Sequence, residues 1–332
     1  MDRQRVTLDC LRDDRAAALA GAKRIEEPYY RELAQRLEQG TATRRVRLEV
    51  PFVRQHHLTC APATLSAISR FWRQPAEHLE VAEAICYEGT PAHSERNWAE
   101  THGWAVREFT VTWEAACALL DRGVPFTLAT AEATSGHIQA VVGYDELRQT
   151  LWIRDPFIYY ANEFLVKPLL ERYRSTGPRG MALVPVARRE LLEGLDLPEA
   201  ALHDQLYSVQ RGLAQHQRGD ALTVCQQMQA EAPAHRLTLT ARRAMAGYDT
   251  NTPALLECLE ELLKQFPEDG NLNLSKLGCL RELARREERL QLLERHCAKR
   301  GVDPIFWQQY AQELRADARQ QAAVSVFANE GA

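Results

Sequence analysis

The sequence predicts an α+β domain followed by an all-α domain of helix-turn-helix repeats. Within residues 46–187, helical patterns come first and short apolar strand patterns follow, which is the order expected of helices packed on an antiparallel sheet. After residue 187 the strand patterns stop, and helical stretches separated by short breaks continue to residue 332. We therefore expect three segments: an N-terminal helical segment (1–45), the α+β domain (46–187) and the helical repeat domain (188–332).

The composition is that of a folded protein with neither a polyanionic nor a membrane partner. Of the 332 residues, 45% are hydrophobic, which excludes a disordered or collagenous chain and allows two domains with cores of their own. The formal net charge of -4 and the lack of a nucleic-acid-binding motif argue against nucleic acid as a partner. No stretch reaches the roughly 20 apolar residues of a membrane helix, and residues 1–15 are too polar for a secretory signal.

The cysteines predict a reducing compartment. The chain has eight, without a Cys-x-x-Cys pair, and at this length without an export signal we expect free thiols in the cytoplasm. Six of them fall in helical stretches, where we expect them to fill the core: Cys86, Cys117, Cys225, Cys258, Cys279 and Cys297. The histidines nearest Cys86 in sequence lack the spacing of a closed zinc site, so we expect no metal and no other cofactor.

Each expected element follows from hydrophobic periodicity and from the turn residues at its ends. Helices are expected over residues 14–38, with interruptions at Gly21 and Pro28, and over 61–72, 79–85, 94–102 and 113–121. Strands are expected over 45–55, 125–130, 137–144 and 151–154. In the helix that begins at residue 61, Pro62 suits the first turn, and Leu65, Ile68 and Trp72 share one face.

The helical repeat domain has a regular period close to that of tetratricopeptide repeats. Pro233, Pro267 and Pro304 recur at nearly equal intervals, and each lies just beyond a helical stretch. One helical pair cannot bury its apolar face alone, so such a period indicates stacked pairs. The run Leu274–Gly278 resembles part of the tetratricopeptide pattern, in which the glycine lets the paired helix approach closely, and Gly219-Asp220-Ala221 resembles its inter-helix turn.

The segment Gln55-His-His-Leu-Thr-Cys60-Ala-Pro carries the clearest chemical signal. Cys60 directly precedes an expected helix, so its sulfur lies near unpaired N–H groups and the positive end of the helix dipole. Both stabilise the thiolate over the thiol, which makes Cys60 a candidate nucleophile. A thiolate still needs a proton donor for the leaving amine, and this must be a histidine from another part of the fold.

His137 and Asp155 are the candidates for the base and for the residue that orients it. His137 opens an expected strand, and Asp155 lies at the end of the next strand along the chain. Two antiparallel strands joined by a short turn would bring the Asp155 carboxylate beside the His137 ring, where it fixes the tautomer. Gln55, in the segment just before Cys60, can direct its amide at the oxyanion, where one donor contributes roughly 3 to 4 kcal/mol.

In sequence order, these motifs resemble those of the bacteriocin-processing, papain-like cysteine peptidases. The matching segments are Gln55-x4-Cys60-x-Pro-Ala, then Gly136-His-Ile-Gln-Ala-Val-Val-Gly-Tyr-Asp, then Ile153-Arg-Asp155-Pro156, within roughly residues 48–185. The resemblance implies a papain-like fold with these roles: nucleophile for Cys60, base for His137, orienting residue for Asp155 and oxyanion hole for Gln55. Ala61 departs from the glycine that usually follows the cysteine. The chain also lacks the transporter segment of the best-known members, which cut after Gly-Gly.

The expected function is a cysteine peptidase that cleaves a peptide or protein, with the helical repeats recruiting the substrate or a protein partner. Two alternatives are open: an acyl transferase or cyclase using the same three groups, and a catalytically silent scaffold whose repeats provide the function. Each candidate residue also has a structural alternative: Cys60 as a small buried hydrophobe, His137 as a core histidine, Asp155 as a turn residue, and Gln55 as an exposed residue with His56 or His57 nearer the site.

Overall fold

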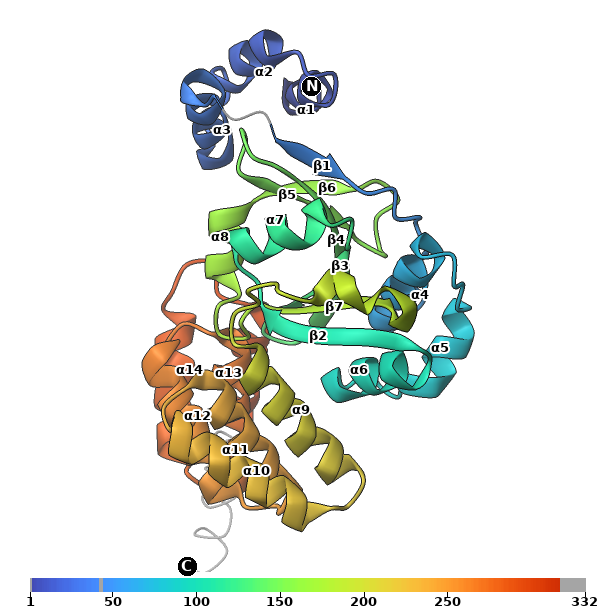
Figure 1. Cartoon of the computed structure of the whole chain (residues 1–332). Helices are drawn as coiled ribbons and strands as arrows, with labels where there is room; N and C mark the ends of the chain where they lie inside the picture. Colours follow the sequence, from blue (N-terminus) through green and yellow to red (C-terminus); the bar gives the residue numbers. More distant parts are fainter. Residues whose placement is uncertain (1, 42–43, 317–332) are drawn as a thin grey trace, which may run out of the picture. The chain divides into compact units, whose positions relative to one another are not determined.

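The computed structural model describes residues 2–41 and 44–316. Contacts divide the chain into two compact units, one of Met1–Thr130 with His137–His203 and one of Ala131–Gly136 with Asp204–Ala332. Figure 1 shows the elements along the chain. The first unit contains an antiparallel sheet with helices, and the second is dominated by helices. The predicted fold class, α+β followed by all-α, is confirmed.

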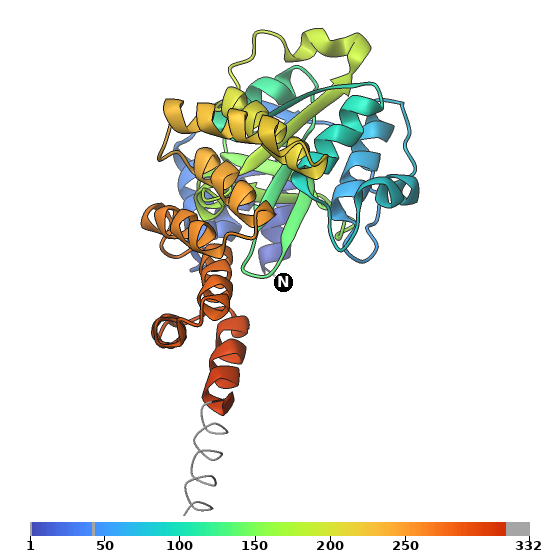
Figure 2. The ribbon, with the colours of Figure 1, turned by 90° about the horizontal axis from the view of Figure 1, so that it is seen from below.

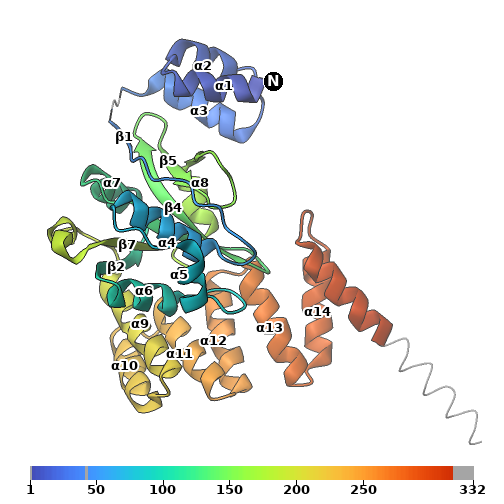
Figure 3. The same cartoon turned by 90° about the vertical axis from the view of Figure 1, so that its right-hand side faces the viewer.

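The first unit begins with three short helices packed together (Figure 3), α1 (Asp2–Leu11), α2 (Arg15–Ala22) and α3 (Pro28–Gln39). The two expected interruptions are present: α2 ends directly after Gly21, and α3 begins at Pro28, which fits a first turn. Gly21 also packs closely on α1, since a Cβ there would lie 2.6 Å from Cγ2 of Val6. The helix α1 itself was not predicted.

Seven strands form one sheet, in the order β2-β7-β3-β4-β5-β6 with β1 paired to β4. Their bounds are Arg45–Arg47 (β1), Trp104–Thr110 (β2), Phe126–Ala131 (β3), Gly136–Asp145 (β4), Thr150–Arg154 (β5), Asn162–Leu165 (β6) and Arg179–Pro185 (β7). The pairs β1–β4, β2–β7, β3–β7, β4–β5 and β5–β6 are antiparallel. The sheet is therefore of the type predicted.

Two hydrophobic cores cover the two faces of the sheet, because successive strand side chains point to opposite sides. One core joins Ala140 and Trp152 to α4 (Cys60–Phe71), α5 (His78–Ile85) and α6 (Ala92–Thr101). The other joins Val141 and Ile153 to α7 (Trp113–Asp121) and α8 (Val166–Arg172). Neighbouring residues of one strand thus belong to different cores. The helix α4 packs on the face that carries Ala140 and Trp152.

Strands that the sequence did not reveal are held by long-range pairing. β2 pairs with β7 from Trp104↔Pro185 to Thr110↔Arg179, although the strands β3 to β6 lie between them along the chain. The short β6 and α8 were also missed. The strand expected over 45–55 forms a ladder with β4 only over Arg45–Arg47. The Leu48 N–H adds one bond to the carbonyl oxygen of Val142, and the Val50 N–H then turns back to Leu48.

A buried ion network joins the N-terminal helices to the sheet. Arg148, in the turn between β4 and β5, is 4% exposed, and its Nε lies 2.8 Å from a Glu163 carboxylate oxygen. Its Nη2 lies 3.1 Å from Asp145, and its Nη1 donates to the carbonyl oxygen of Cys10 at 3.5 Å. A buried guanidinium is tolerated only when paired, so this cluster holds the end of α1 at the sheet.

The helices of the second unit follow one another as in a repeat array (Figures 2 and 3). The helices from α9 onward have these bounds: Ala200–Ala214 (α9), Arg218–Glu231 (α10), Arg236–Tyr248 (α11), Thr252–Gln265 (α12), Gly270–Glu282 (α13) and Arg286–Cys297 (α14). A further helix covers residues 304–316. Pro233 and Pro267 follow α10 and α12, so the interval between these prolines covers two helices. Residues 317–332 of the predicted repeat domain lie outside the described residues. None of the helices that the structure describes is long and apolar enough to cross a bilayer.

Two details of the tetratricopeptide resemblance are wrong. Gly278 lies in α13 with nothing within 4 Å of the place where a Cβ would be, so no paired helix approaches it closely. Gly219-Asp220-Ala221 lies within the first turns of α10, and the turn before that helix is formed by residues 215–217. A closer approach occurs instead at Gly212 of α9, where a Cβ would lie 3.3 Å from Cβ of Ala221.

Gly143 provides a test of the β1–β4 pairing. A Cβ at this position would lie 2.3 Å from the carbonyl oxygen of Val46, so Gly143→Ala must displace β1. We expect the free energy of unfolding to fall by about 1 to 3 kcal/mol, measured by urea titration. Gly278→Ala is the matched control, since the same change in open space on a helix should be neutral or stabilise by up to about 1 kcal/mol. Equal stability of the two variants would contradict the pairing.

Candidate active site

Cys60 is the first residue of α4 and lies at the positive end of its dipole. Pro62 follows in the first turn, where its missing N–H leaves no hydrogen bond unmade. The Cys60 sulfur is half-buried and accepts a hydrogen bond from the backbone of Ala61. The helix start thus gives Cys60 both a donor and a favourable potential for a thiolate.

The His137 ring and the Asp155 carboxylate meet because β4 and β5 are antiparallel neighbours. Ala140 pairs with Arg154 in this ladder, so Asp155, directly beyond β5, lies near the start of β4. The distance from Nε2 of His137 to Oδ1 of Asp155 is 2.9 Å. The same oxygen accepts the N–H of Phe157 at 2.8 Å, which fixes the carboxylate.

Contacts between α4 and β4 bring Cys60 to His137. The hydroxyl of Thr64, one turn after Cys60, donates to the carbonyl oxygen of Ile138 at 3.0 Å. The His137 side chain and the Ile138 backbone both lower the pKa of Cys60, so the sulfur lies near these two groups. Since Nε2 of His137 faces Asp155, Nδ1 is the ring nitrogen left for the sulfur. Sulfur, imidazole and carboxylate are therefore neighbours, and we call them the Cys–His–Asp cluster.

Hydrogen bonds within the Cys–His–Asp cluster favour the charged form of each member. Burial alone would raise the pKa of Cys60, but its hydrogen bonds to His137 and to the Ile138 backbone outweigh burial and lower it. Burial would lower the pKa of His137, but the bonds to Asp155 and Cys60 raise it to about 9. Burial would raise the pKa of Asp155, but the bond from His137 lowers it. Cys60 and His137 can thus coexist as thiolate and imidazolium.

The turn between Gln55 and Cys60 is held by polar contacts that sequence reasoning missed. The Thr59 hydroxyl accepts the N–H of His56 at 2.8 Å and lies 2.9 Å from Nε2 of His78. Thr59 and His78 are 9% and 7% exposed, and the His78 ring stacks on His56 with centroids 5.3 Å apart. A threonine just before a helix is a visible signal, but His78 belongs to the following helix, α5, and no local pattern links the two.

Cys86 holds the same turn from a second side. It caps the C-terminal end of α5, is half-buried, and its Sγ donates to the carbonyl oxygen of Leu58 at 3.2 Å. Leu58 has a φ of 59°, a strained conformation for a non-glycine residue that such contacts must support. The prediction that Cys86 fills the core is therefore wrong.

The other helical cysteines largely follow the prediction. Cys117 of α7 packs against the core but is only half-buried, so it lies at the edge of the core and does not fill it. The remaining helical cysteines are buried as predicted: Cys225, Cys258, Cys279 and Cys297.

Gln55 lies beside the segment that follows Asp155. Its backbone N–H donates to the carbonyl oxygen of Pro156 at 3.0 Å, which joins the two stretches of chain. Its side-chain Oε1 is buried and has no hydrogen-bond partner among the residues that the structure describes. Gln55 is half-buried, whereas His56 and His57 are exposed.

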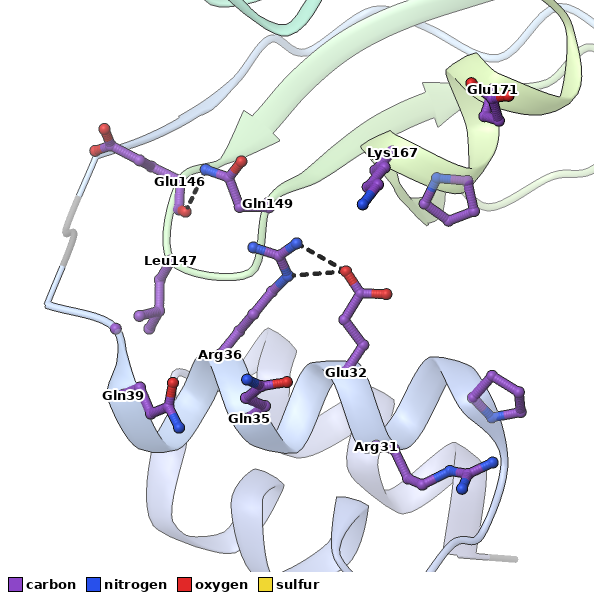
Figure 4. A pocket seen from close by; sticks show the side chains of 13 residues that line it. Arg31, Glu32, Gln35, Arg36, Gln39, Glu146, Leu147, Gln149, Lys167 and Glu171 are labelled. Carbon is purple, nitrogen blue, oxygen red and sulfur yellow. Dashed lines mark hydrogen bonds and ion pairs between the residues drawn. The ribbon is translucent and has the colours of Figure 1, made fainter.

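A cavity of about 970 Å³ lies between α3, the β4–β5 turn and α8 (Figure 4). Its lining includes three basic and three acidic side chains: Arg31, Arg36, Lys167, Glu32, Glu146 and Glu171. Arg36 donates to Glu32 at 2.7 Å, so these charges are partly paired already. No member of the Cys–His–Asp cluster lines this cavity, and the candidate chemistry is elsewhere.

Comparison with known proteins supports the family resemblance. Residues 47–180 match the model of the Peptidase_C39 like family. The resemblance inferred from the motifs is thereby confirmed for this part of the chain, and the match ends before the helical unit begins. No curated protein shows significant similarity to the sequence.

Three solved structures are similar to the same part of the chain. The peptidase domain of Streptococcus ComA, a bifunctional ABC transporter involved in quorum sensing, has 20% identity and a TM-score of 0.34, covering 41% of this chain and 99% of that one. A C39-like peptidase from Bacillus anthracis has 14% identity and a TM-score of 0.36, covering 43% and 98%. A double glycine motif protease from an AMS/PCAT transporter, solved with its leader peptide, has 14% identity and a TM-score of 0.34, covering 42% and 94%.

The lowered pKa of Cys60 can be tested by alkylation. We expect iodoacetamide to modify Cys60 near neutral pH much faster than Cys10 or Cys117, because burial raises the pKa of those thiols to about 11 and about 12. Timed labelling between about pH 6 and 10, read by peptide mass spectrometry, measures each site. His137→Ala removes a hydrogen bond that lowers the pKa of Cys60 and should move its labelling midpoint to higher pH. An unmoved midpoint would mean that the imidazole does not act on the sulfur.

The Thr59 hydroxyl offers a second test. Thr59→Val keeps the shape but leaves the His56 N–H and His78 Nε2 without their partner, which costs about 1 to 3 kcal/mol. Thr59→Ser keeps the hydroxyl and serves as the control. We expect the valine variant to unfold at lower temperature and to label more slowly at Cys60, and the serine variant to behave like the parent. Identical behaviour of the two variants would exclude a role for the hydroxyl.

Proposed function

We propose that this chain is a cysteine peptidase in which Cys60 is the nucleophile, His137 the acid–base group and Asp155 the residue that orients it. The main support is the hydrogen bond between His137 and Asp155, together with the action of His137 in lowering the pKa of Cys60. A cysteine that only fills space has a pKa raised by burial, as at Cys10, whereas the pKa of Cys60 is lowered despite burial. The match of residues 47–180 to the Peptidase_C39 like family agrees with this chemistry.

In the first half of the proposed reaction, the Cys60 thiolate attacks the carbonyl carbon of the scissile peptide bond. The negative charge moves to the carbonyl oxygen, and a tetrahedral intermediate forms. His137, as the imidazolium, then gives its proton to the leaving nitrogen as the carbon–nitrogen bond breaks. The products of this half are a free amine and a thioester on Cys60.

In the second half, His137 is neutral and takes a proton from water as the water oxygen attacks the thioester carbon. Collapse of the second tetrahedral intermediate releases a carboxylic acid and restores the thiolate–imidazolium pair. Asp155 stays ionised throughout, because its lowered pKa keeps it a carboxylate at neutral pH. Its bond to Nε2 holds the ring so that Nδ1 faces the sulfur.

Gln55 is our candidate for the oxyanion hole, together with the backbone N–H of Cys60. Its position is supported by the hydrogen bond from its backbone to Pro156, which keeps it near the cluster. A preorganised donor of this kind contributes roughly 3 to 4 kcal/mol to stabilisation of the intermediate. The contacts of Thr59 with His56 and His78 would hold this donor and Cys60 in register.

We also infer that the helices of the second unit recruit a protein substrate or partner. Successive helix pairs, as in α10 to α13, make an extended surface whose area grows with each repeat. Binding away from the scissile bond adds affinity without requiring tight contacts at the reacting atoms.

The proposal is tested by hydrolysis of a peptide library at different pH values. Activity should fall at low pH as the Cys60 thiolate is protonated, at a pH below the ordinary thiol pKa of 9.0, and fall again near pH 9 as His137 loses its proton. Cys60→Ala should abolish cleavage while leaving the unfolding temperature unchanged. Cleavage that survives this substitution would refute the assigned nucleophile.

The same reaction in ¹⁸O-labelled water distinguishes hydrolysis from acyl transfer. Hydrolysis places one labelled oxygen in the new carboxylate, because water is the second nucleophile. Transfer to an amine, or cyclisation, leaves the product unlabelled. A labelled product in mass spectrometry supports the peptidase, whereas an unlabelled amide product assigns the chain to acyl transfer.

A further inference from the structure

A cleft in the first unit is lined by arginine and aromatic side chains, and its volume of about 370 Å³ lies within the range of ligand-binding sites. We call it the aromatic–arginine cleft. Six residues of its lining carry the argument: Leu11, Arg47, Phe52, Arg154, Tyr159 and Tyr160. Arginine and aromatic side chains are the types that contribute most at peptide-binding sites.

Two residues of the cleft lie close in sequence to the candidate catalytic residues, although none of those residues lines the cleft. One wall contains Phe52, which lies shortly before Gln55 in the chain, and the other contains Arg154, which directly precedes Asp155. The Gln55 N–H donates to the carbonyl oxygen of Pro156 at 3.0 Å, so the two walls are joined where they reach the Cys–His–Asp cluster. In the proposed arrangement, a peptide bound at Cys60 extends its neighbouring residues along this connection toward the cleft.

The cleft carries two positive charges and no acidic lining residue. Arg154 donates from Nη1 to the carbonyl oxygen of Tyr159 at 2.8 Å, and its Nε is buried without a partner among the described residues. Arg47 approaches Glu49 only to 3.9 Å, too far for a hydrogen bond, and that carboxylate is largely in solvent. Burial and the nearby charge of Arg47 lower the pKa of Arg154, and the charge of Glu49 offsets this only in part. An anionic group in the cleft would relieve this repulsion and use the free N–H donors.

The cavity of Figure 4 does not share this imbalance. Its lining has three basic and three acidic side chains, and Arg36 is already paired with Glu32. A cavity with balanced charges has no preference for an anion. The aromatic–arginine cleft has such a preference.

Aromatic packing holds the two walls in place. The rings of Phe52 and Tyr159 meet edge to face with centroids 5.4 Å apart. The Arg47 guanidinium stacks on the buried Trp152 ring at 4.9 Å from its centroid. The positive group is therefore positioned before any ligand arrives, which reduces the entropy lost on binding.

The N-terminal helices add a wall that lies outside the family match of residues 47–180. Leu11 of α1 lines the aromatic–arginine cleft and also an adjoining cavity of about 700 Å³, which shares Trp152 and Tyr160 with it. Tyr29 and Leu33 of α3 line that second cavity. Apolar residues of a bound segment can continue into this space.

We propose that the aromatic–arginine cleft is a specificity site that binds an aspartate or glutamate side chain of the peptide substrate. This inference rests on the proposed peptidase function. Its consequence is a preference for an acidic residue at one position near the cleaved bond. The carboxylate accepts hydrogen bonds from Arg47 and Arg154, and the aromatic walls enclose the neighbouring residues.

The test uses the full chain and a synthetic peptide library in which Asp and Glu, or Asn and Gln, occupy each position in turn. The parent protein should cleave peptides with Asp or Glu at one position about tenfold better, in kcat/KM, than the matched amides. Arg47→Gln should remove this ratio, and Arg47→Glu should favour Lys at the same position. Arg31→Gln, the same change in the charge-balanced cavity, is the control and should keep the ratio. Peptides amidated at the C-terminus should behave like free acids, because the bound group is a side chain.

A second arm separates the cleft from the catalysis. Immobilised Cys60→Ala protein is mixed with the same library, and the retained peptides are sequenced. Cleavage without an acidic preference would overturn the cleft and leave the peptidase standing. The Cys60→Ala protein could retain acidic peptides and lose this retention with Arg47→Gln, while the parent protein cleaves no peptide. That result would support the cleft and refute the peptidase. Neither cleavage nor acidic retention would overturn both, and dependence on a free C-terminus would overturn the side-chain assignment.

Discussion

The antiparallel pairing of β4 with β5 is the constraint on which the candidate site depends. It places Asp155, just past one strand, at Nε2 of His137 near the start of the other, and so leaves Nδ1 for a third group. The strands reach this register because their residues alternate between the two cores, Val141 and Ile153 toward one and Ala140 toward the other. A shift by one residue would move each side chain to the opposite core, which is packed for different side chains.

The third group arrives with α4, and its chemistry comes from the helix start. Packing of α4 on the sheet brings the Cys60 sulfur to the imidazole, and Thr64 fixes the contact through the backbone of Ile138. Burial there opposes charge, but the hydrogen bonds more than offset it for every member of the Cys–His–Asp cluster. The turn before Cys60 is strained at Leu58 and is supported by Thr59, His78 and Cys86 around it.

Segments outside the family match shape the surroundings of this site. Arg148 draws α1 to the sheet by its hydrogen bond to the Cys10 carbonyl oxygen, and the end of α1 then becomes part of the aromatic–arginine cleft through Leu11. The same sheet thus carries the Cys–His–Asp cluster at one place and the arginines of the cleft at another. In our proposal, selectivity comes from groups that do not react.

The sequence by itself determined that helices precede strands in the first domain, that a helix begins next to Cys60, and which strands lie at His137 and just before Asp155, because these depend on local periodicity, proline and turn residues. Tertiary structure decided the rest: the pairing of β2 with β7, the contact of Thr59 with His78, and the half-buried state of Cys86. Each of these features depends on contacts between residues far apart along the chain. The open space at Gly278 is another example, since a glycine in a motif does not show which helix approaches it. Local sequence patterns do not specify such contacts, because packing decides them.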